Sequence, residues 1–291
     1  MAARAGRRRA WSLLSDAVRG TGDLTRREAA ADDAVRAPVN TSRRLTFVAA
    51  DGGTGTTTIA AACARVLAAR RPGPVLATDA SGGAAGLGLR CGANALVEFS
   101  ALTDDEPPRG LADAAARLPL APHGLRVAGT AAWNPPVSEW IGAVNAVGRF
   151  FEIVVTDAGQ RSAREASAFA AASHAVTVAG RTDAGSLEAS AELALRLRAE
   201  HPGTAVVLVA SGVGGPLPGG IANAPWPAGR PVVVPHDHAA ASSLITPLPQ
   251  LAAPTMTALT QLAAELLTSA RAHTGAAAPG PATAPHPGSS A

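Results

Sequence analysis

The sequence contains no lysine and no tyrosine. All 25 of its basic residues are therefore arginine, and aromatic residues make up only 3% of the 291 positions. Without lysine, no side chain can place an ammonium group on a phosphate. With so few aromatic residues, we expect a hydrophobic core built from alanine, valine and leucine.

Cysteine and long apolar runs are also scarce. Cys63 and Cys91 have neither the spacing of a zinc site nor a disulfide-rich context, so we expect both to be reduced. No apolar run is long enough to span a membrane, and Asp16 and Arg19 interrupt the apolar stretch near the start. These features favour a cytoplasmic protein without an export signal.

Charge divides the chain into a tail and a body. Residues 1–44 hold ten arginines against five acidic residues, whereas the rest holds fifteen against seventeen. We expect a basic, disordered tail over 1–43, one domain over 44–272, and a disordered Ala/Pro-rich tail over 273–291. The basic tail offers peripheral contact with an anionic membrane surface, although a solvated tail is favoured. Nonspecific DNA contact is a weaker alternative.

The most informative motif is the glycine-rich segment VAADGGTGTTT at 48–58. It has the outline of a phosphate-binding loop, in which backbone N–H groups hold phosphates, a lysine reaches them and a Ser/Thr hydroxyl binds Mg²⁺. The candidate contact residues are Gly52, Gly53, Thr54, Gly55, Thr56, Thr57 and Thr58. Thr57 stands at the Mg²⁺ position, but Thr56 replaces the lysine and Asp51 adds a carboxylate. A charge pair at 4 Å is worth about 4 kcal/mol at an effective dielectric of about 20. Because the loop loses the attraction of a lysine and gains the repulsion of Asp51, ATP should bind weakly.

The surroundings of the loop distinguish a true phosphate loop from a chance glycine turn, which remains the alternative. A buried strand at 44–49 precedes it, an Ala-rich helix at 57–70 follows, and a second strand comes at 75–79. Further strands are predicted at 151–159, 174–179, 204–210 and 231–235, with a helix at 185–200. This order predicts an α/β fold, a three-layer doubly wound sheet that is mostly parallel.

These motifs resemble those of the ParA/MinD family of deviant-Walker ATPases. The family loop, Lys-Gly-Gly-x-Gly-Lys-Thr-Thr, aligns with residues 51–58, and its first lysine, which crosses the dimer interface, is Asp51 here. Asp79 matches the first carboxylate of the family's Asp-x-Asp, and Ser81 replaces the second. The strand at 151–159 resembles Walker B, with Asp157 in the metal-facing position.

The resemblance implies a P-loop NTPase fold of the SIMIBI type. It also implies that Asp79 and Asp157 belong to the nucleotide site, with Thr57 and Asp157 on Mg²⁺ if nucleotide binds. Ser211 follows the strand where the family often carries an adenine-reading asparagine, and the loop at 236–238 would lie beside the base. The turn after Asp79 is more like actinobacterial septum-site and pilus-positioning (CpaE-like) proteins, or relatives near type VII secretion loci, than like plasmid ParA.

Two functions follow from the resemblance. The favoured one is a noncatalytic or very weakly active scaffold or regulator of a positioning, division, pilus or secretion system, with no nucleotide cofactor. It would bind a protein partner of a membrane-associated complex, and dimerisation is compatible with it. The alternative is an Mg·ATP-dependent ATPase in which Arg90 or Arg161 replaces the lysine. The first is favoured because Ala50, Asp51, Thr56 and Ser81 each remove part of the catalytic set.

Other candidate sites carry weaker signals. His236, Asp237 and His238 alternate as metal ligands do, but a solvated turn, or the wall of the base pocket, is the favoured interpretation. No serine has a base at a recognisable spacing. The tryptophans at 133, 140 and 226 are assigned equally to a partner surface or to the core. The apolar stripe from Met256 to Leu267 predicts a final helix that packs on the core.

Overall fold

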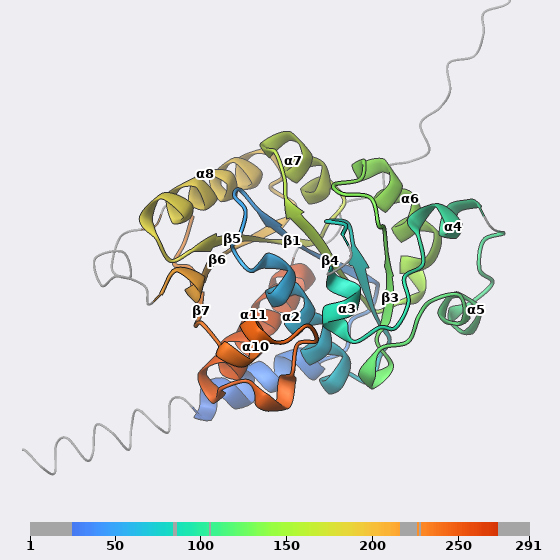
Figure 1. Ribbon diagram of the computed structural model, residues 1–291, viewed down its shortest axis with the longest axis horizontal. Coiled ribbons are helices and arrows are strands. Elements are labelled where there is room, and N and C mark those ends of the chain that lie inside the picture. The colour runs from blue at the N-terminus through green and yellow to red at the C-terminus, as the bar shows by residue number, and fades with distance from the viewer. Residues whose placement is uncertain (1–24, 84–85, 105, 216–225, 227, 273–291) are drawn as a thin grey trace, which may run out of the picture.

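The computed structural model describes residues 25–83, 86–104, 106–215, 226 and 228–272 (Figure 1). Seven strands form one sheet in the order β3-β2-β4-β1-β5-β6-β7, and every pairing is parallel. The strands are β1 (Arg43–Ala49), β2 (Val75–Asp79), β3 (Arg126–Gly129), β4 (Ile153–Gln160), β5 (Ala175–Arg181), β6 (Ala205–Ser211) and β7 (Val232–Val234). The predicted doubly wound α/β fold is confirmed.

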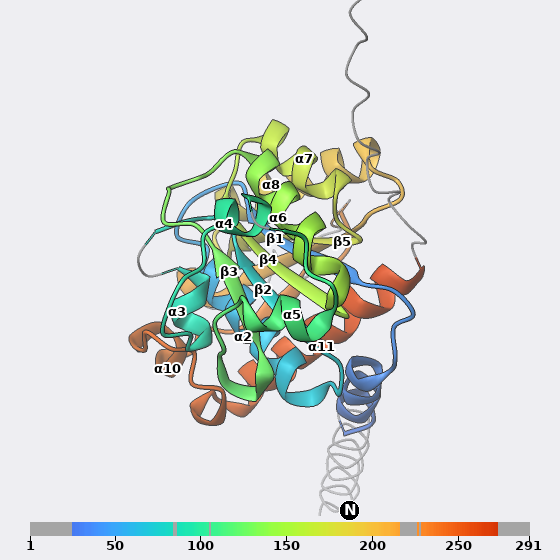
Figure 2. The same ribbon diagram turned by 90° about the vertical axis from the view of Figure 1, so that its right-hand side faces the viewer.

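Helices cover both faces of the sheet (Figures 1 and 2). One face packs against α2 (Thr56–Arg70), α3 (Leu87–Cys91), α10 (His238–Ser242) and α11 (Ala253–Ala272). The other packs against α4 (Phe99–Asp104), α5 (Leu111–Ala116), α6 (Val137–Val147), α7 (Ala163–Ala171) and α8 (Ala184–Glu200). Short 3₁₀ turns lie at Pro122–Gly124, Gly148–Phe150, Gly212–Gly214 and Leu248–Gln250.

Side chains along β1 point alternately to the two faces of the sheet, and each face has its own hydrophobic core. Leu45 and Phe47 are fully buried on the α2 side, and Val48 is buried on the opposite side. Thr46, also buried on the opposite side, bonds the hydroxyl of Ser173 at 2.7 Å, which satisfies both polar groups. The core is mainly Ala, Val and Leu, as the composition predicts.

Trp140 supplies the largest side chain of the second core and is fully buried. Its indole N–H lies 3.2 Å from the hydroxyl of Thr78 on β2 and 3.1 Å from that of Thr156 on β4. Each of these threonines directly precedes an aspartate, Asp79 on β2 and Asp157 on β4. Trp140 therefore belongs to the core and not to a partner surface, and it supports the strands that carry Asp79 and Asp157.

The folded part of the chain begins before residue 44, where the sequence analysis placed its boundary. Residues 25–36 form a helix on the α2 and α11 side of the sheet, and Ala31 and Val35 are buried in that core. Asp32 pairs with Arg70 at 2.7 Å, and Arg271 donates to the carbonyl of Ala34 at 3.2 Å. These contacts correct the prediction for 25–43; residues 1–24 and 273–291 lie outside the described residues.

The final helix and the cysteines follow expectation. Leu259, Leu262 and Leu266 of α11 are buried, so the stripe packs on the core. Cys63 and Cys91 are free and buried, and burial raises the pKa of each thiol to about 12. Within the part of the chain described, no helix combines the length and apolar character needed to cross a bilayer.

Candidate functional site: a glycine-loop cavity at the carboxyl ends of the strands

The glycine-rich loop joins β1 to α2 at the carboxyl edge of the sheet. Gly53 (φ 71°) and Gly55 (φ 75°) adopt the left-handed conformation that glycine tolerates best. The helix then begins at Thr56, with no side-chain cap and no acidic residue in its first turn. The loop borders a cavity of about 470 Å³. Its other walls come from residues 81–83, Gly86, Arg90, Trp133, Asn134, Gly159 and Gln160.

The residue at the lysine position points into the loop itself. The hydroxyl of Thr56 lies 2.6 Å from that of Thr54, and both threonines are buried. Because each hydroxyl satisfies the other, the loop is complete without a lysine side chain. Thr56 therefore provides neither charge nor reach toward a phosphate.

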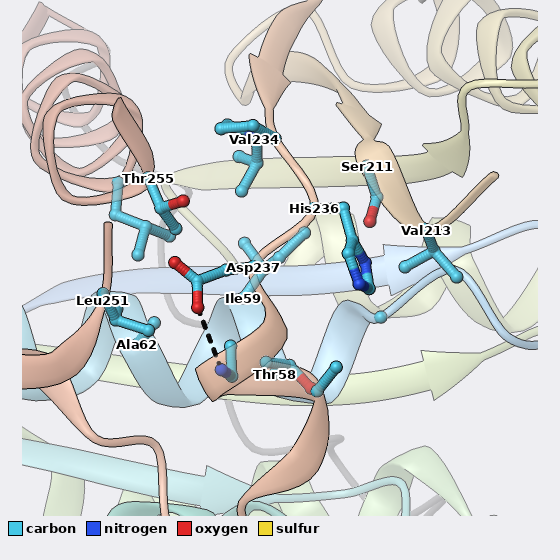
Figure 3. Close-up of a pocket in the computed structure, with 15 residues that line it drawn as sticks. Thr58, Ile59, Ala62, Ser211, Val213, Val234, His236, Asp237, Leu251 and Thr255 are labelled. Carbon is cyan, nitrogen blue, oxygen red and sulfur yellow. Dashed lines mark hydrogen bonds between the residues drawn. The ribbon is translucent and has the colours of Figure 1, made fainter. Parts of the chain in front are cut away.

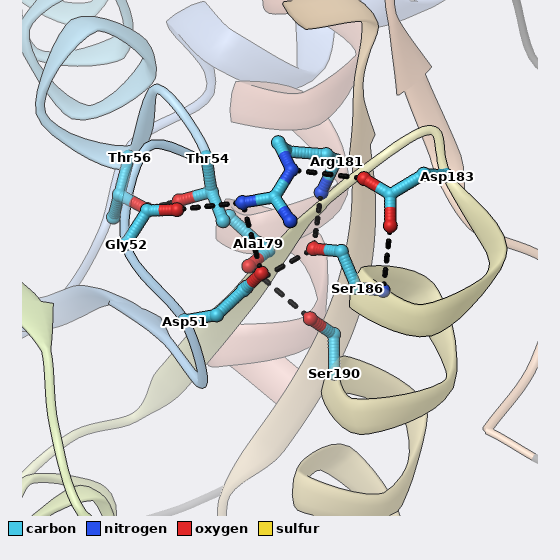
Figure 4. A network of polar contacts seen from close by, with 9 residues as sticks. All are labelled: Asp51, Gly52, Thr54, Thr56, Ala179, Arg181, Asp183, Ser186 and Ser190. Carbon is cyan, nitrogen blue, oxygen red and sulfur yellow. Dashed lines mark hydrogen bonds and ion pairs between the residues drawn. The ribbon is translucent and has the colours of Figure 1, made fainter. Parts of the chain in front are cut away.

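Asp51 is held within its own chain by the junction of β5 and α8 (Figure 4). Its carboxylate pairs with Arg181 at 3.0 Å and accepts a hydrogen bond from the hydroxyl of Ser186 at 3.0 Å. The same guanidinium donates to the carbonyl of Gly52 at 2.7 Å and pairs with Asp183 at 2.8 Å. Two carboxylates thus share the charge of Arg181, and this charge is not free for a phosphate.

The two predicted aspartates face each other across neighbouring strands. Asp79 on β2 lies opposite Asp157 on β4, and both are buried. The Ser81 hydroxyl is 2.8 Å from Asp79 Oδ1 and 3.3 Å from Asp157 Oδ2. Burial, then the charge of Asp79, raise the pKa of Asp157 to about 7, partly opposed by hydrogen bonds from Thr57, Gly159 and Ser81.

These groups fit a divalent cation in their donor chemistry. The Thr57 hydroxyl hydrogen-bonds Asp157, so the two predicted Mg²⁺ ligands are neighbours. Their oxygen atoms are the kind that Mg²⁺ prefers, and a cation would offset the cost of the buried carboxylate charge. The remaining ligands of a bound Mg²⁺ would have to be waters or ligand oxygens.

The two arginines proposed to replace the lysine differ sharply. The Arg161 side chain is fully buried and donates to the carbonyls of Ala158 and Pro135, at 2.9 and 3.2 Å, while it pairs with Glu165 at 3.1 Å. It stabilises the strand ends, and the sequence-based suggestion that it binds phosphate is not supported by this geometry. Arg90 lines the cavity, and its Nη1 is buried without a hydrogen-bond partner among the described residues.

A second, smaller cavity of about 140 Å³ lies on the other side of the loop (Figure 3). Ser211 and His236 line it, together with mainly apolar side chains such as Ile59, Val234 and Leu259, whereas His238 does not. Asp237 also lines it, but its carboxylate accepts from the backbone N–H of Ala240 and Ala252, at 3.1 and 2.8 Å, so it fixes the start of α10. The described residues contain no cluster of three or more potential metal ligands.

Some polar neighbours were not predicted because they are far apart in sequence. Arg181 contacts Asp51 and Gly52 of the glycine-rich loop, which lies far earlier in the chain. Nothing in the sequence around Arg181 indicated this contact. Ser167 Oγ lies 2.7 Å from His201 Nε2 and 2.6 Å from Glu200 Oε2. Ser167 sits within α7, whose backbone N–H groups bond within the helix, so this Ser–His contact lacks the oxyanion-binding amides a hydrolase needs.

A parallel sheet with a glycine loop between β1 and a helix, an aspartate at the end of β2 and an aspartate in the neighbouring strand β4 defines the P-loop α/β class of protein folds. The solved structures that share this fold include a ParA family ATPase from Chlorobium tepidum, with TM-score 0.54, 17% identity, and 76% of this chain and 98% of that one covered.

MinD, a cell division ATPase from Pyrococcus furiosus, gives a TM-score of 0.57 at 19% identity, over 78% of this chain and 98% of its own. The septum site-determining MinD of Pyrococcus horikoshii, in complex with Mg-ADP, gives a TM-score of 0.53 at 16% identity. The match covers 77% of this chain and 96% of that one. At these identities the likeness establishes the fold. No model of a known protein family and no curated protein sequence matches the chain.

Proposed function

We propose that this protein is a ParA/MinD-like scaffold or regulator that does not hydrolyse nucleotide. The observation that carries the proposal is the way in which the loop is closed without a lysine. Thr56 bonds Thr54, and Asp51 bonds Arg181 and Ser186 of its own chain. The loop therefore keeps its backbone shape while both lysines of the family pattern are absent and the charge of Arg181 is already paired.

The proposed role is in spatial organisation, through a protein partner of a positioning, division, pilus or secretion system. The fold's solved neighbours include one protein described as a cell division ATPase and one described as a septum site-determining protein. Trp133 is 73% exposed at the rim of the loop cavity, where a large aromatic side chain suits a partner contact. Association through the loop face would not require hydrolysis.

The test is calorimetric titration of the full chain with Mg·ATP, together with a phosphate-release assay. The proposal expects no saturable binding below millimolar concentrations and no turnover. Micromolar binding accompanied by hydrolysis would refute it, because the chain would then be an ATPase despite its altered loop.

A gain-of-function variant sharpens this test. Thr56→Lys and Asp51→Lys together restore the two family lysines, but a lysine at 51 would face the guanidinium of Arg181, now 3.0 Å from the Asp51 carboxylate. The triple variant with Arg181→Ser removes that like-charge contact and should bind Mg·ATP more tightly than the double variant. Arg181→Ser alone is the matched control and should not gain affinity.

A further inference from the structure

The end of β5 holds the glycine-rich loop from one side. Arg181, the last residue of that strand, donates to the carbonyl of Gly52 at 2.7 Å and pairs with the carboxylate of Asp51 at 3.0 Å. Both partners lie in the loop (Figure 4). The Arg181 side chain therefore fixes the backbone of the loop and its acidic side chain together.

The residue that follows Arg181 holds a second segment. The backbone N–H of Thr182 donates to the carbonyl of Ser211 at 3.1 Å, and its hydroxyl donates to the carbonyl of Gly215 at 2.7 Å. Thr182 is buried, and Gly215 directly follows the 3₁₀ turn Gly212–Gly214. Two consecutive residues thus connect the glycine-rich loop to the segment that leaves β6.

The loop and this segment also contact each other directly. A Cβ on Gly55 would lie 3.3 Å from Val213 Cγ2, so the end of the loop packs against the turn. Gly212 is fixed separately, because a Cβ there would collide with the backbone of His236. The part of the segment that depends on the loop and on Thr182 is therefore residues 213–215.

Together these contacts form a closed ring, in which the loop, the end of β5 and residues 213–215 each touch the other two. The ion pair of Arg181 is its most exposed contact, since the side chains of Arg181 and Asp51 are 32% and 30% exposed. Partly exposed ion pairs contribute little free energy and are screened by salt. The ring can therefore open locally while the domain stays folded, as weakly held surface segments do.

We infer that Arg181 is a latch that holds the glycine-rich loop and residues 213–215 in one arrangement, and that opening it releases both segments together. The inference rests on the proposed noncatalytic function and adds a means of regulation to it. A protein partner that displaces Arg181 from Asp51 changes the loop face without any nucleotide hydrolysis. Val213 is 50% exposed, so its release also alters an apolar part of the surface.

Hydrogen exchange of the full chain without nucleotide, measured by mass spectrometry, tests the latch. Arg181→Ser removes the ion pair and the hydrogen bond to Gly52, and it should raise exchange about fivefold in both 51–56 and 213–215. Asp51→Asn, which removes only the charge of that side chain, should raise both by less. Arg196→Ser is the matched control, because Arg196 on α8 is 54% exposed and pairs with Glu200 of its own helix. It should leave both segments unchanged.

Salt provides a test that needs no variant. Sodium chloride at about 1 M screens exposed charges, so it should raise exchange of wild type in the same two segments. It should have little further effect on Arg181→Ser, in which the ion pair is already absent. If Arg181→Ser has a much lower melting temperature than wild type, Asp51→Asn and the salt series decide the question.

The outcomes separate the inference from the proposed function. Faster exchange in both segments, with unchanged circular dichroism, supports the latch. Faster exchange in 51–56 alone shows that the loop moves independently and overturns it, as does equal exchange in wild type and Arg181→Ser. Hydrolysis of Mg·ATP by wild type, measured separately, overturns the scaffold proposal, whereas the exchange data alone decide whether Arg181 couples the two segments.

Discussion

At the residue scale, the positions that depart from the nucleotide-binding pattern have acquired local partners. Asp51 bonds Arg181 and Ser186, and Ser81 bonds Asp79. At both positions, the residue that replaces a family residue hydrogen-bonds to side chains of its own chain. Asp51 and Arg181 are partly exposed, whereas Ser81, Asp79 and Ser186 are buried, and the hydrogen bonds of these three groups stabilise the loop in this conformation.

Asp157 gives a pH-dependent prediction at the same scale. Its folded pKa of about 7 lies above the ordinary value of 3.8, so the folded state holds an extra proton between these values. The contribution of Asp157 to the free energy of unfolding is therefore fully present below pH 3.8, and it is lost as the pH rises through 7. Asp157→Asn removes the buried charge and should raise the free energy of unfolding at pH 8 by about 2 kcal/mol.

Urea denaturation at pH 5 and pH 8 measures this effect. The gain from Asp157→Asn should be clearly larger at pH 8, where the wild-type carboxyl is ionised. An equal gain at both values, or a loss at pH 8, would show that Asp157 titrates as an ordinary carboxyl or that its hydrogen bonds outweigh the cost of burial.

At the scale of elements, the strands and helices around the loop were predictable because their signals are local. Buried strands read as continuous apolar runs, and glycines marked the start of α2. The short strand β3 gave no such signal, since it has four residues and begins with Arg126. The helix at 25–36 was missed because its charged composition resembles a tail, and its burial depends on α2 and α11.

The site was predictable only in part, because sequence patterns report local structure and not contacts between distant segments. Positions along the loop and the strand ends follow from motif order, so Asp79 and Asp157 could be expected to meet. The partners of the unusual residues could not, because Arg181 and Arg90 approach the loop through tertiary packing that leaves no pattern in the sequence. The sequence also does not give the direction of a side chain, and Arg161 is buried within the protein whereas Arg90 lines the cavity.

The junction of the loop with α2 yields a prediction about backbone conformation. Gly55 has φ 75°, and a Cβ there would lie 3.3 Å from both Ser211 Oγ and Val213 Cγ2. Gly55→Ala should therefore lower the free energy of unfolding by about 1–2 kcal/mol, from left-handed strain and crowding together. Gly53→Ala is the matched control, since it shares the positive φ but meets nothing within 4 Å.

Chemical denaturation distinguishes the two variants through their midpoints at constant slope. A larger loss for Gly55→Ala measures the contact between the loop and the end of β6. Equal losses would mean that this contact relaxes freely and that the loop is not braced by Ser211 and Val213.

At the scale of the whole molecule, arginines connect the N-terminal helix to the core. Arg71, at the end of α2, donates to the carbonyls of Val35 and Ala37 and pairs with Glu152 at 2.7 Å. Arg271, at the end of α11, donates to the carbonyls of the same helix end. Donors at a helix C-terminus satisfy its free carbonyls and complement its dipole, so the helix at 25–36 is part of the folded domain.

This arrangement changes how the basic tail should be tested. Removing residues 1–36 exposes the surface that Val35 buries and deprives Arg71 of one acceptor, the carbonyl of Val35. It should lower the free energy of unfolding by at least about 2 kcal/mol, or roughly 4–8 °C in melting temperature. Removing residues 1–24 alone retains every one of these contacts and serves as the matched control. If both truncations have the same melting temperature, the helix at 25–36 contributes nothing to the stability of the domain. If only the shorter truncation keeps the wild-type melting temperature, that variant is the one to test on anionic vesicles. A loss of vesicle binding by it can then be attributed to the tail.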